Sequence, residues 1–103
     1  MPQPTLTPWP ADGEAPSRET LERLFAAADL SPSWWSNAPH DRYSPHSHTY
    51  HKVLYCARGG ITFVVPDAGD FRLRAGDRLD IPPGTTHAAV VGPEGVTCVE
   101  ASA

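Results

Sequence analysis

The stretch HSHTYHKVLYCARGG, residues 46–60, holds the residues on which the prediction of the fold depends. Side chains two positions apart point to the same face of an extended strand, so His46 and His48 project their imidazoles into one space. A second stretch, GDRLDIPPGTTH at residues 76–87, ends in His87 shortly after a tight Pro-Pro-Gly turn. A barrel that places the two stretches side by side would bring the three imidazoles together.

Outward from these stretches, proline and glycine clusters divide the chain into short extended segments. Strands are expected near residues 33–37, 42–48, 52–58, 61–65, 70–74, 78–81, 86–91 and 95–100. Many short strands separated by turns are typical of an antiparallel sandwich or barrel. Alternation along the strands predicts a core that contains Val53, Tyr55, Ile61, Phe63, Phe71, Leu73, Leu79, Ile81, Ala89, Val91, Val96 and Cys98. Gly59 and Gly84 are expected at turns that need unusual backbone angles.

A single helix is expected at about residues 18–29, before the first of these strands. Ser17 is a suitable N-cap, and Glu19 lies in the first turn, where negative charge suits the helix dipole. The apolar residues of this segment recur at helical spacing and form one stripe, which is expected to pack on the outside of the barrel. They are Leu21, Leu24, Phe25 and Ala28.

The length of 103 residues suits one domain with a small core. The hydrophobic fraction of 40% is sufficient for one core to be buried. Residues 1–16 are rich in proline and are expected to form a flexible arm, which Trp9 would attach to the body of the protein. Residues 17–103 are expected to form the domain, with the barrel at about 33–101. A second copy would cover further apolar surface, so a homodimer is expected.

The net charge of −4, without a cluster of Lys and Arg, argues against binding to nucleic acid and to an anionic membrane surface. The apolar runs are too short to cross a bilayer, and the N-terminus lacks the features of a signal peptide. A cytoplasmic location is therefore expected. Cys56 and Cys98 would then be reduced and buried.

The spacing around the first two histidines resembles a known motif. His46-x-His48, three residues, Lys52, six residues and Gly59 resembles the first cupin motif, which runs His-x-His, three or four residues, Glu, six residues, Gly. The main departure is Lys52, which stands where the motif has the glutamate that is normally the fourth metal ligand.

The second stretch resembles the second cupin motif. Its spacing of Gly76, five residues, Pro82-x-Gly84, two residues and His87 matches throughout, although Val91 stands where that motif usually ends in Asn. The resemblance implies an all-β fold, the cupin double-stranded β-helix or jelly-roll barrel, with one N-terminal α-helix. Cupins host many unrelated activities, so the resemblance implies the fold more strongly than the function.

The resemblance implies that His46, His48 and His87 bind one divalent transition metal. Three neutral imidazoles with open coordination positions suit Zn, Mn, Fe, Ni or Cu. An ammonium about 4 Å from the metal would be repelled by about 4 kcal/mol per unit charge at an effective dielectric near 20. Either Lys52 points away, or it is neutral, or no metal binds. Alternatively, a bulge near residues 49–50 turns His51 inward as a fourth ligand.

The same stretches supply candidates for a ligand pocket. Lys52, Tyr43 and Tyr50 are the residues expected to line it. Trp34 and Trp35 are neighbours, so one is expected in the core and the other against the helix or a partner subunit. Asp80 and Glu100 are expected to be surface charges, with a role as partners of a histidine N–H as the alternative.

Three functions are consistent with these residues, and whether the chain is an enzyme stays open. The leading hypothesis is a small metal-binding cupin that binds or transforms a small organic molecule inside the barrel. The second is a non-catalytic cupin that binds or senses a small molecule at a degenerate metal site, with Lys52 paired to an anionic ligand. The third is an interaction scaffold that uses the tryptophan-bearing N-terminal segment.

Overall fold

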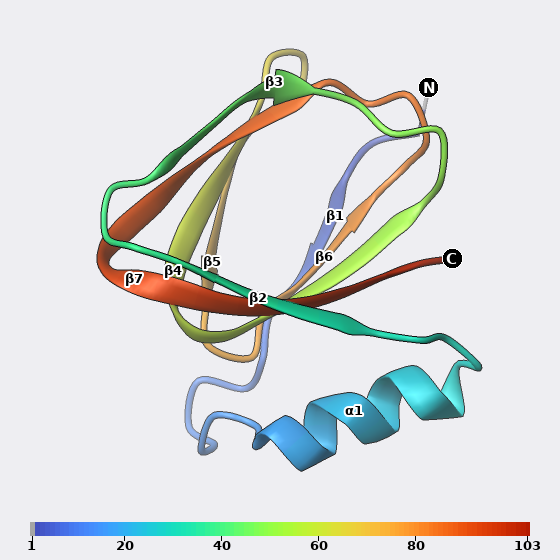
Figure 1. Cartoon of the computed structure of the whole chain (residues 1–103), viewed down its shortest axis with the longest axis vertical. Coiled ribbons are helices and arrows are strands. Elements are labelled where there is room, and N and C mark those ends of the chain that lie inside the picture. Colours follow the sequence, from blue (N-terminus) through green and yellow to red (C-terminus); the bar gives the residue numbers. More distant parts are fainter. Residues whose placement is uncertain (1) are drawn as a thin grey trace.

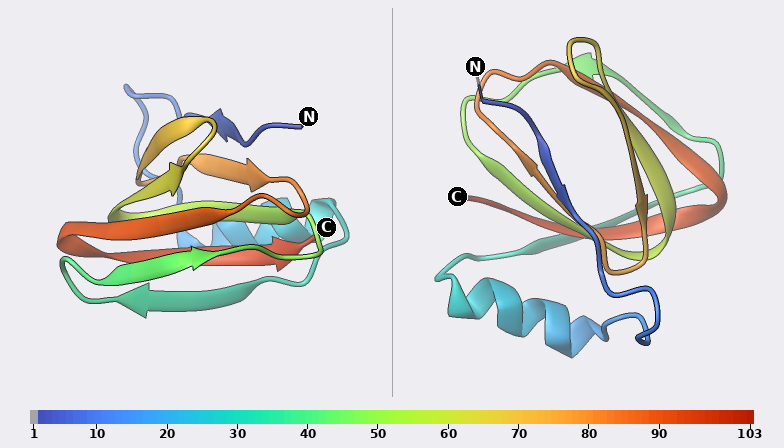
Figure 2. Two further views of the ribbon diagram at one scale, coloured as in Figure 1. Left: turned by 90° about the horizontal axis from the view of Figure 1, so that it is seen from above. Right: turned by 180° about the vertical axis from the view of Figure 1, so that it is seen from behind.

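In the computed structural model, which describes residues 2–103, the strands form a single antiparallel sheet that curls into an open barrel (Figure 1). The elements in chain order are β1 (Thr5–Thr7), α1 (Arg18–Ala27), β2 (Ser33–Asn37), β3 (Arg42–His46), β4 (Lys52–Val65), β5 (Gly69–Arg74), β6 (Arg78–Ile81) and β7 (His87–Ser102). The strand order is β1-β6-β4-β7-β2, and β3 also pairs with β7 while β5 pairs with β4. Helix α1 lies outside the barrel (Figure 2). The prediction of an antiparallel β-barrel with one N-terminal helix is confirmed.

Strands β4 and β7 are longer than predicted, because each joins two segments that were expected to be separate strands. They pair from Lys52 opposite Ser102 to Val64 opposite Ala88. Gly59 and Gly95 lie between the segments that were expected to be separate. Each glycine bends its strand, Gly59 in β4 and Gly95 in β7, and does not end it. Gly59 and Gly95 have φ angles of 78° and 77°, and the register shifts on both sides of Gly59.

These register shifts change which residues of β4 face the interior. Before the shifts, the even-numbered Leu54 and Cys56 belong to the inner cluster, and after them the odd-numbered Ile61 and Phe63 do. A bulge adds one residue to a strand and so exchanges its two faces. The prediction that Val53 and Tyr55 share the barrel core is wrong in this respect, because both are buried on the outer face beneath α1.

The buried apolar residues therefore form two clusters, one inside the barrel and one between the barrel and the helix. The inner cluster consists of Leu54, Cys56, Ile61, Phe63, Leu73, Leu79, Ile81, Ala89, Val91, Val96 and Cys98, with Phe71 partly buried against it. The outer cluster consists of Leu21, Phe25, Val53, Tyr55, Val99 and Ala101. Cys56 and Cys98 are register partners, both free and both buried, which agrees with the expectation for reduced cysteines.

Helix α1 begins as predicted and ends two residues earlier. The Ser17 side chain accepts a hydrogen bond from the Thr20 N–H at 3.1 Å. Only Leu21 and Phe25 of the expected stripe are buried, whereas Leu24 is 39% exposed and Ala28 is exposed at the C-cap. The narrower stripe reflects the short helix, which touches the sheet along one i, i+4 row. Within residues 2–103, no helix has the length and hydropathy of a membrane span.

The proline-rich segment before the helix takes part in the sheet, which differs from the flexible arm expected for residues 1–16. Strand β1 pairs with β6, with Thr5 opposite Asp80, and so covers an edge whose backbone groups would otherwise be unpaired. The backbone N–H of Trp9 donates to the Asp77 carboxylate at 2.9 Å, so Trp9 attaches this segment to the barrel as expected. Met1 lies outside the described residues.

Replacing Gly59 by Ala is expected to destabilise the protein far more than replacing Gly84 by Ala. The two glycines have similar φ angles, 78° and 75°, and this conformation alone costs alanine about 1–2 kcal/mol. A Cβ on Gly59 would lie 2.0 Å from the Gly95 carbonyl oxygen, whereas one on Gly84 would meet nothing within 4 Å. Urea denaturation should show a loss of at least about 3 kcal/mol for Gly59→Ala and about 1–2 kcal/mol for Gly84→Ala. Equal losses would contradict the close approach of β4 and β7.

Candidate metal centre

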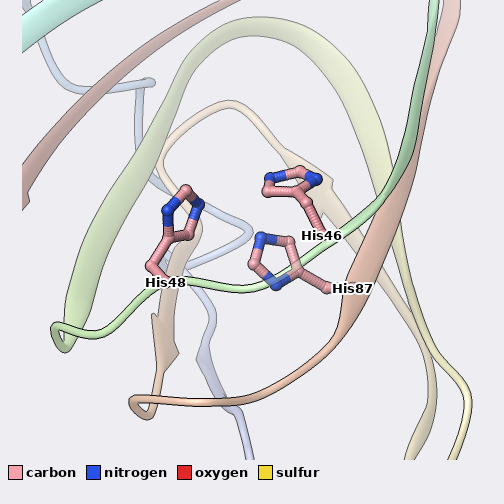
Figure 3. Close-up of side chains that lie close together, drawn as sticks. All are labelled: His46, His48 and His87. Atoms are coloured by element: carbon pink, nitrogen blue, oxygen red, sulfur yellow. The ribbon is translucent and has the colours of Figure 1, made fainter.

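Three histidines from two distant parts of the sequence meet inside one end of the barrel. His46 ends β3, His48 lies in the loop that follows, and His87 begins β7 (Figure 3). One ring nitrogen from each residue can be chosen so that all three lie within 4.8 Å of one another. The ring centroids are separated by 4.4 Å between His46 and His87, 4.9 Å between His46 and His48, and 5.4 Å between His48 and His87. The structure thus brings together the three histidines that the motifs singled out.

A register shift in β3 directs His46 toward the interior. Tyr43 is opposite Ala89 and His46 is opposite His87, although simple alternation would put residues 43 and 46 on different faces. The shift between them resets the alternation, and Pro45 is tolerated there because a bulge does not need every backbone N–H. Directly opposite residues of an antiparallel pair have Cβ atoms about 5 Å apart, which explains why the two rings come together.

Backbone carbonyls select the ring nitrogens that face the centre of the cluster. The Nδ1–H of His46 donates to the Ser44 carbonyl at 2.8 Å, and the Nδ1–H of His87 donates to the Thr85 carbonyl at 2.9 Å. These bonds leave the lone pair on Nε2 of both rings. The Nε2 atoms of His48 and His87 are buried and have no hydrogen-bond partner in the described part of the chain.

The burial of these nitrogens indicates that the site suits a cation. An unpaired buried polar atom costs about 1–3 kcal/mol, and one metal ion shared by the three rings would remove that cost. Two nitrogens on one zinc ion lie at most about 4.2 Å apart, because each Zn–N bond is about 2.1 Å. Small ring movements therefore separate the present arrangement from a coordinated one. The residues fit a transition metal.

The surroundings also favour the neutral form of the His48 and His87 imidazoles, which is the form that binds metal. Burial lowers the pKa of His87, and the neighbouring His46, Lys52 and His48 lower it further, while the bond to the Thr85 carbonyl opposes the change. Burial likewise lowers the pKa of His48, with additional lowering by Lys52 and His46. Lone pairs on both rings are thus available near neutral pH.

Lys52, which replaces the motif glutamate, points into the barrel and not away from it. Even-numbered residues at the start of β4 face inward, so Lys52 lies on the same face as Leu54, with its side chain only 9% exposed. Its Nζ atom lies 3.3 Å from Oε2 of Glu100, and Oε1 of Glu100 accepts the Trp35 indole N–H at 2.8 Å. The expectation that Glu100 is a surface charge is therefore wrong, because β7 directs it into the barrel beside Lys52.

His51 does not join the histidine cluster. It lies on the opposite face from Lys52, and its Nε2 is 2.9 Å from Oδ1 of Asp80, which Arg78 also binds. Burial raises the pKa of Asp80, but the hydrogen bonds from Arg78 and His51 outweigh this effect and lower it. The ionised carboxylate thus holds the His51 ring outside the barrel, and the inward turn considered from the sequence is not observed.

A cavity of about 160 Å³ adjoins the histidines. It is lined by Trp35, Tyr43, His46, Lys52, Phe63, His87, Ala89 and Glu100. Of the expected pocket residues, Lys52 and Tyr43 line this cavity, whereas the Tyr50 ring lies against His48 at 4.9 Å. Glu100 was missed as a pocket residue, although its position two residues after the inward Cys98 was a usable signal.

The two adjacent tryptophans face opposite sides, as predicted. Trp35 packs against the inner cluster, and its ring meets Tyr43 edge to face at 5.8 Å. Trp34 packs against the outer cluster, with the Arg18 guanidinium 4.1 Å above its ring. Trp35 therefore belongs to the wall of the cavity, and Trp34 helps to attach α1.

Comparisons with known proteins place the barrel in a wider group. Residues 33–99 match the family model described as the cupin domain. A protein of unknown function from Rhizobium leguminosarum has a TM-score of 0.65 at 15% identity, over 73% of this chain and 70% of that chain. An RmlC-like cupin from Shewanella frigidimarina has a TM-score of 0.62 at 26% identity, over 71% of this chain and 64% of that chain.

A third similar structure is the polyketide cyclase RemF from Streptomyces resistomycificus, with a TM-score of 0.63 at 25% identity. The similarity covers 71% of this chain and 54% of that chain. No curated protein matches this sequence. The comparisons therefore identify the family and leave the specific ligand and activity to be inferred from the site.

The stability of the metal-free protein is expected to fall as the pH is lowered below about 6.5. His48 and His87 have lowered pKa values in the folded state and ordinary values near 6.5 in the unfolded chain. Below about pH 6.5 the unfolded state therefore binds more protons than the folded state. The free energy of unfolding falls as the pH is lowered from about 6.5 toward the folded-state pKa values. Urea melts between about pH 7.5 and about pH 5.5 measure this slope.

A matched pair of variants tests the assignment of the slope. His48→Gln combined with His87→Gln should flatten it, whereas His40→Gln, at an exposed loop position, should leave it unchanged. A wild-type profile without a slope in this range would contradict the assignment.

Proposed function

This chain belongs to the cupin family, and on that premise we propose that it binds one divalent transition metal through His46, His48 and His87. We propose further that it binds or transforms a small organic molecule in the adjoining cavity. The observation that carries the proposal is the pair of buried Nε2 atoms, on His48 and His87, that lack a partner among residues 2–103. Three imidazoles leave coordination positions open for a ligand.

The residues around the cluster have separate tasks in this proposal. The Ser44 and Thr85 carbonyls orient the rings of His46 and His87, and the Phe63 ring centroid lies 6.2 Å from that of His87. Lewis-acid polarisation of a ligand oxygen is the chemistry that a divalent ion supplies at such a site. Zn, Mn, Fe, Ni and Cu all suit three imidazole ligands, so the donor set does not select among them.

The proposal also includes a catalytic role and an oligomeric state. A catalytic role is supported by the similarity to RemF, since that protein is a cyclase built on this fold. A homodimer is supported by the small size of the domain, and the acidic composition without a basic cluster argues against nucleic acid as a partner.

Loss of one histidine ligand is expected to abolish tight metal binding. His46→Ala and His87→Ala should each weaken zinc binding by more than about 100-fold, since even the partners of metal ligands contribute about 10–100-fold. His51→Ala is the matched control and should bind zinc as the wild type does, because His51 lies on the outer face with Asp80. Competition titration with a chromophoric chelator measures the affinities. A wild-type protein that takes up less than about a tenth of an equivalent of each of the five metals would refute the proposal.

A second candidate is a non-catalytic module that binds or senses a small molecule at a degenerate metal site. The observation in its favour is Lys52, whose ammonium lies in the cavity wall with His46 and His87. Even at about 10 Å and an effective dielectric of about 20, an ammonium repels a divalent ion by roughly 3 kcal/mol. In this candidate the cavity binds its ligand through Lys52 and the imidazoles without a metal.

The variant Lys52→Glu separates the two candidates. It restores the motif carboxylate and removes the repulsion, so metal affinity should rise at least tenfold, which requires only about 1.4 kcal/mol. Without metal, the new carboxylate would face Glu100, so the apo variant should be less stable than the apo wild type. If only the variant binds metal, the second candidate is supported. If the wild type and the variant both bind metal, the first candidate is supported. Equal metal affinities of the two proteins would show that Lys52 does not act on the site.

A further inference from the structure

The charges of the two ionic side chains that line the cavity cancel before a metal is counted. Imidazoles bind a metal in their neutral form and then contribute no charge. Lys52 and Glu100 contribute one positive and one negative charge. A divalent ion would leave the site with two uncompensated positive charges. With the motif glutamate at position 52, the same sum would be zero. The replacement therefore shifts the charge of the site toward binding of an anion.

Lys52 has capacity to bind a further acceptor. An ammonium has three N–H donors, and Glu100 is the one carboxylate within 4.0 Å of Nζ in the part of the chain that the structure describes. The side chain is 9% exposed and lines the cavity together with His46 and His87. A ligand oxygen in the cavity can thus meet both the ammonium and the face of the histidine cluster.

Glu100 is held as the internal counter-ion of this ammonium. One carboxylate oxygen accepts the Trp35 indole N–H and the other faces Lys52, so the side chain is positioned from both sides. A ligand anion would share Lys52 with Glu100 or compete for it. Glu100 therefore lowers the affinity of the cavity for anions while it compensates the buried charge in the absence of ligand.

The remaining walls and the volume limit the rest of the ligand. Trp35, Phe63 and Ala89 supply the apolar part of the lining, and the Trp35 ring adjoins the charged pair through its bond to Glu100. The cavity has a volume of about 160 Å³. A small molecule with one polar group and a short apolar part suits this volume and lining.

We infer that the cavity recognises a small organic anion, whose carboxylate or enolate oxygen pairs with Lys52 beside the histidine cluster and whose apolar part packs on Trp35 and Phe63. The inference rests on the proposed function, since the two positive charges of the bound metal remain uncompensated after Glu100 has balanced Lys52. It adds the class of ligand and assigns two residues to its recognition. Lys52 attracts the anion, and Glu100 sets how strongly it does so.

Isobutyrate and isobutyramide are suitable probes, because they have the same shape and differ in charge. Zinc-loaded protein is titrated with each, and the NMR signal of the Trp35 indole N–H, which contacts Glu100, reports binding. Lys52→Gln should weaken isobutyrate binding at least about tenfold and isobutyramide binding less than about threefold, and Lys52→Arg should retain most of the isobutyrate affinity. Glu100→Gln should strengthen isobutyrate binding by at least about threefold, because the competing carboxylate is gone.

The outcomes separate this inference from the proposed function. Zinc uptake with isobutyrate affinity unchanged in Lys52→Gln overturns the inference and leaves the metal site standing. Absence of zinc uptake by the wild type overturns both. If Lys52→Gln does not fold, Glu100→Gln decides, since unchanged or weaker isobutyrate binding in that variant also overturns the inference.

Discussion

The register of β7 against its neighbours is the constraint on which the rest of the structure depends. This strand pairs with β2, β3 and β4, so its residues are aligned with three other segments at once. Its first residue, His87, is opposite His46 of β3. Near its other end, Glu100 meets Trp35 from β2 and Lys52 from β4. A slip of one residue would turn all of these side chains to the other face of the sheet.

The site combines imidazole rings, an ammonium and a carboxylate in a small volume. Burial lowers the pKa values of His48 and His87, and Lys52 lowers both further because its positive charge disfavours a second one nearby. Glu100 compensates that ammonium, and so two ionic side chains remain in the wall of a largely apolar cavity. A buried ion pair contributes little to stability against its desolvation penalty, which makes a role in ligand recognition the better explanation for its presence.

Much of the fold and part of the site could be predicted from the sequence, and the errors in assigning the core have a common cause. Turn residues and apolar alternation located most of the strands, and the helix cap at Ser17 was correct. The errors arise where strands bend instead of ending, at Gly59 and Gly95, because a glycine with positive φ is equally typical of a turn and of a bulge. Each bulge exchanges the faces of a strand, so Val53 and Tyr55 were assigned to the wrong cluster.

The sequence by itself determined the identity of the three histidines, the barrel type and the position of the substitution at Lys52, because these follow from the spacing of residues along the chain. Only the tertiary structure decided that Lys52 faces the cavity while His51 is held outside by Asp80, and that Glu100 is the partner of Lys52. Alternation gives the relative orientation of neighbouring residues but not which face is inside. That choice is made by register shifts and by which segments pair, and both depend on contacts between residues far apart in the chain.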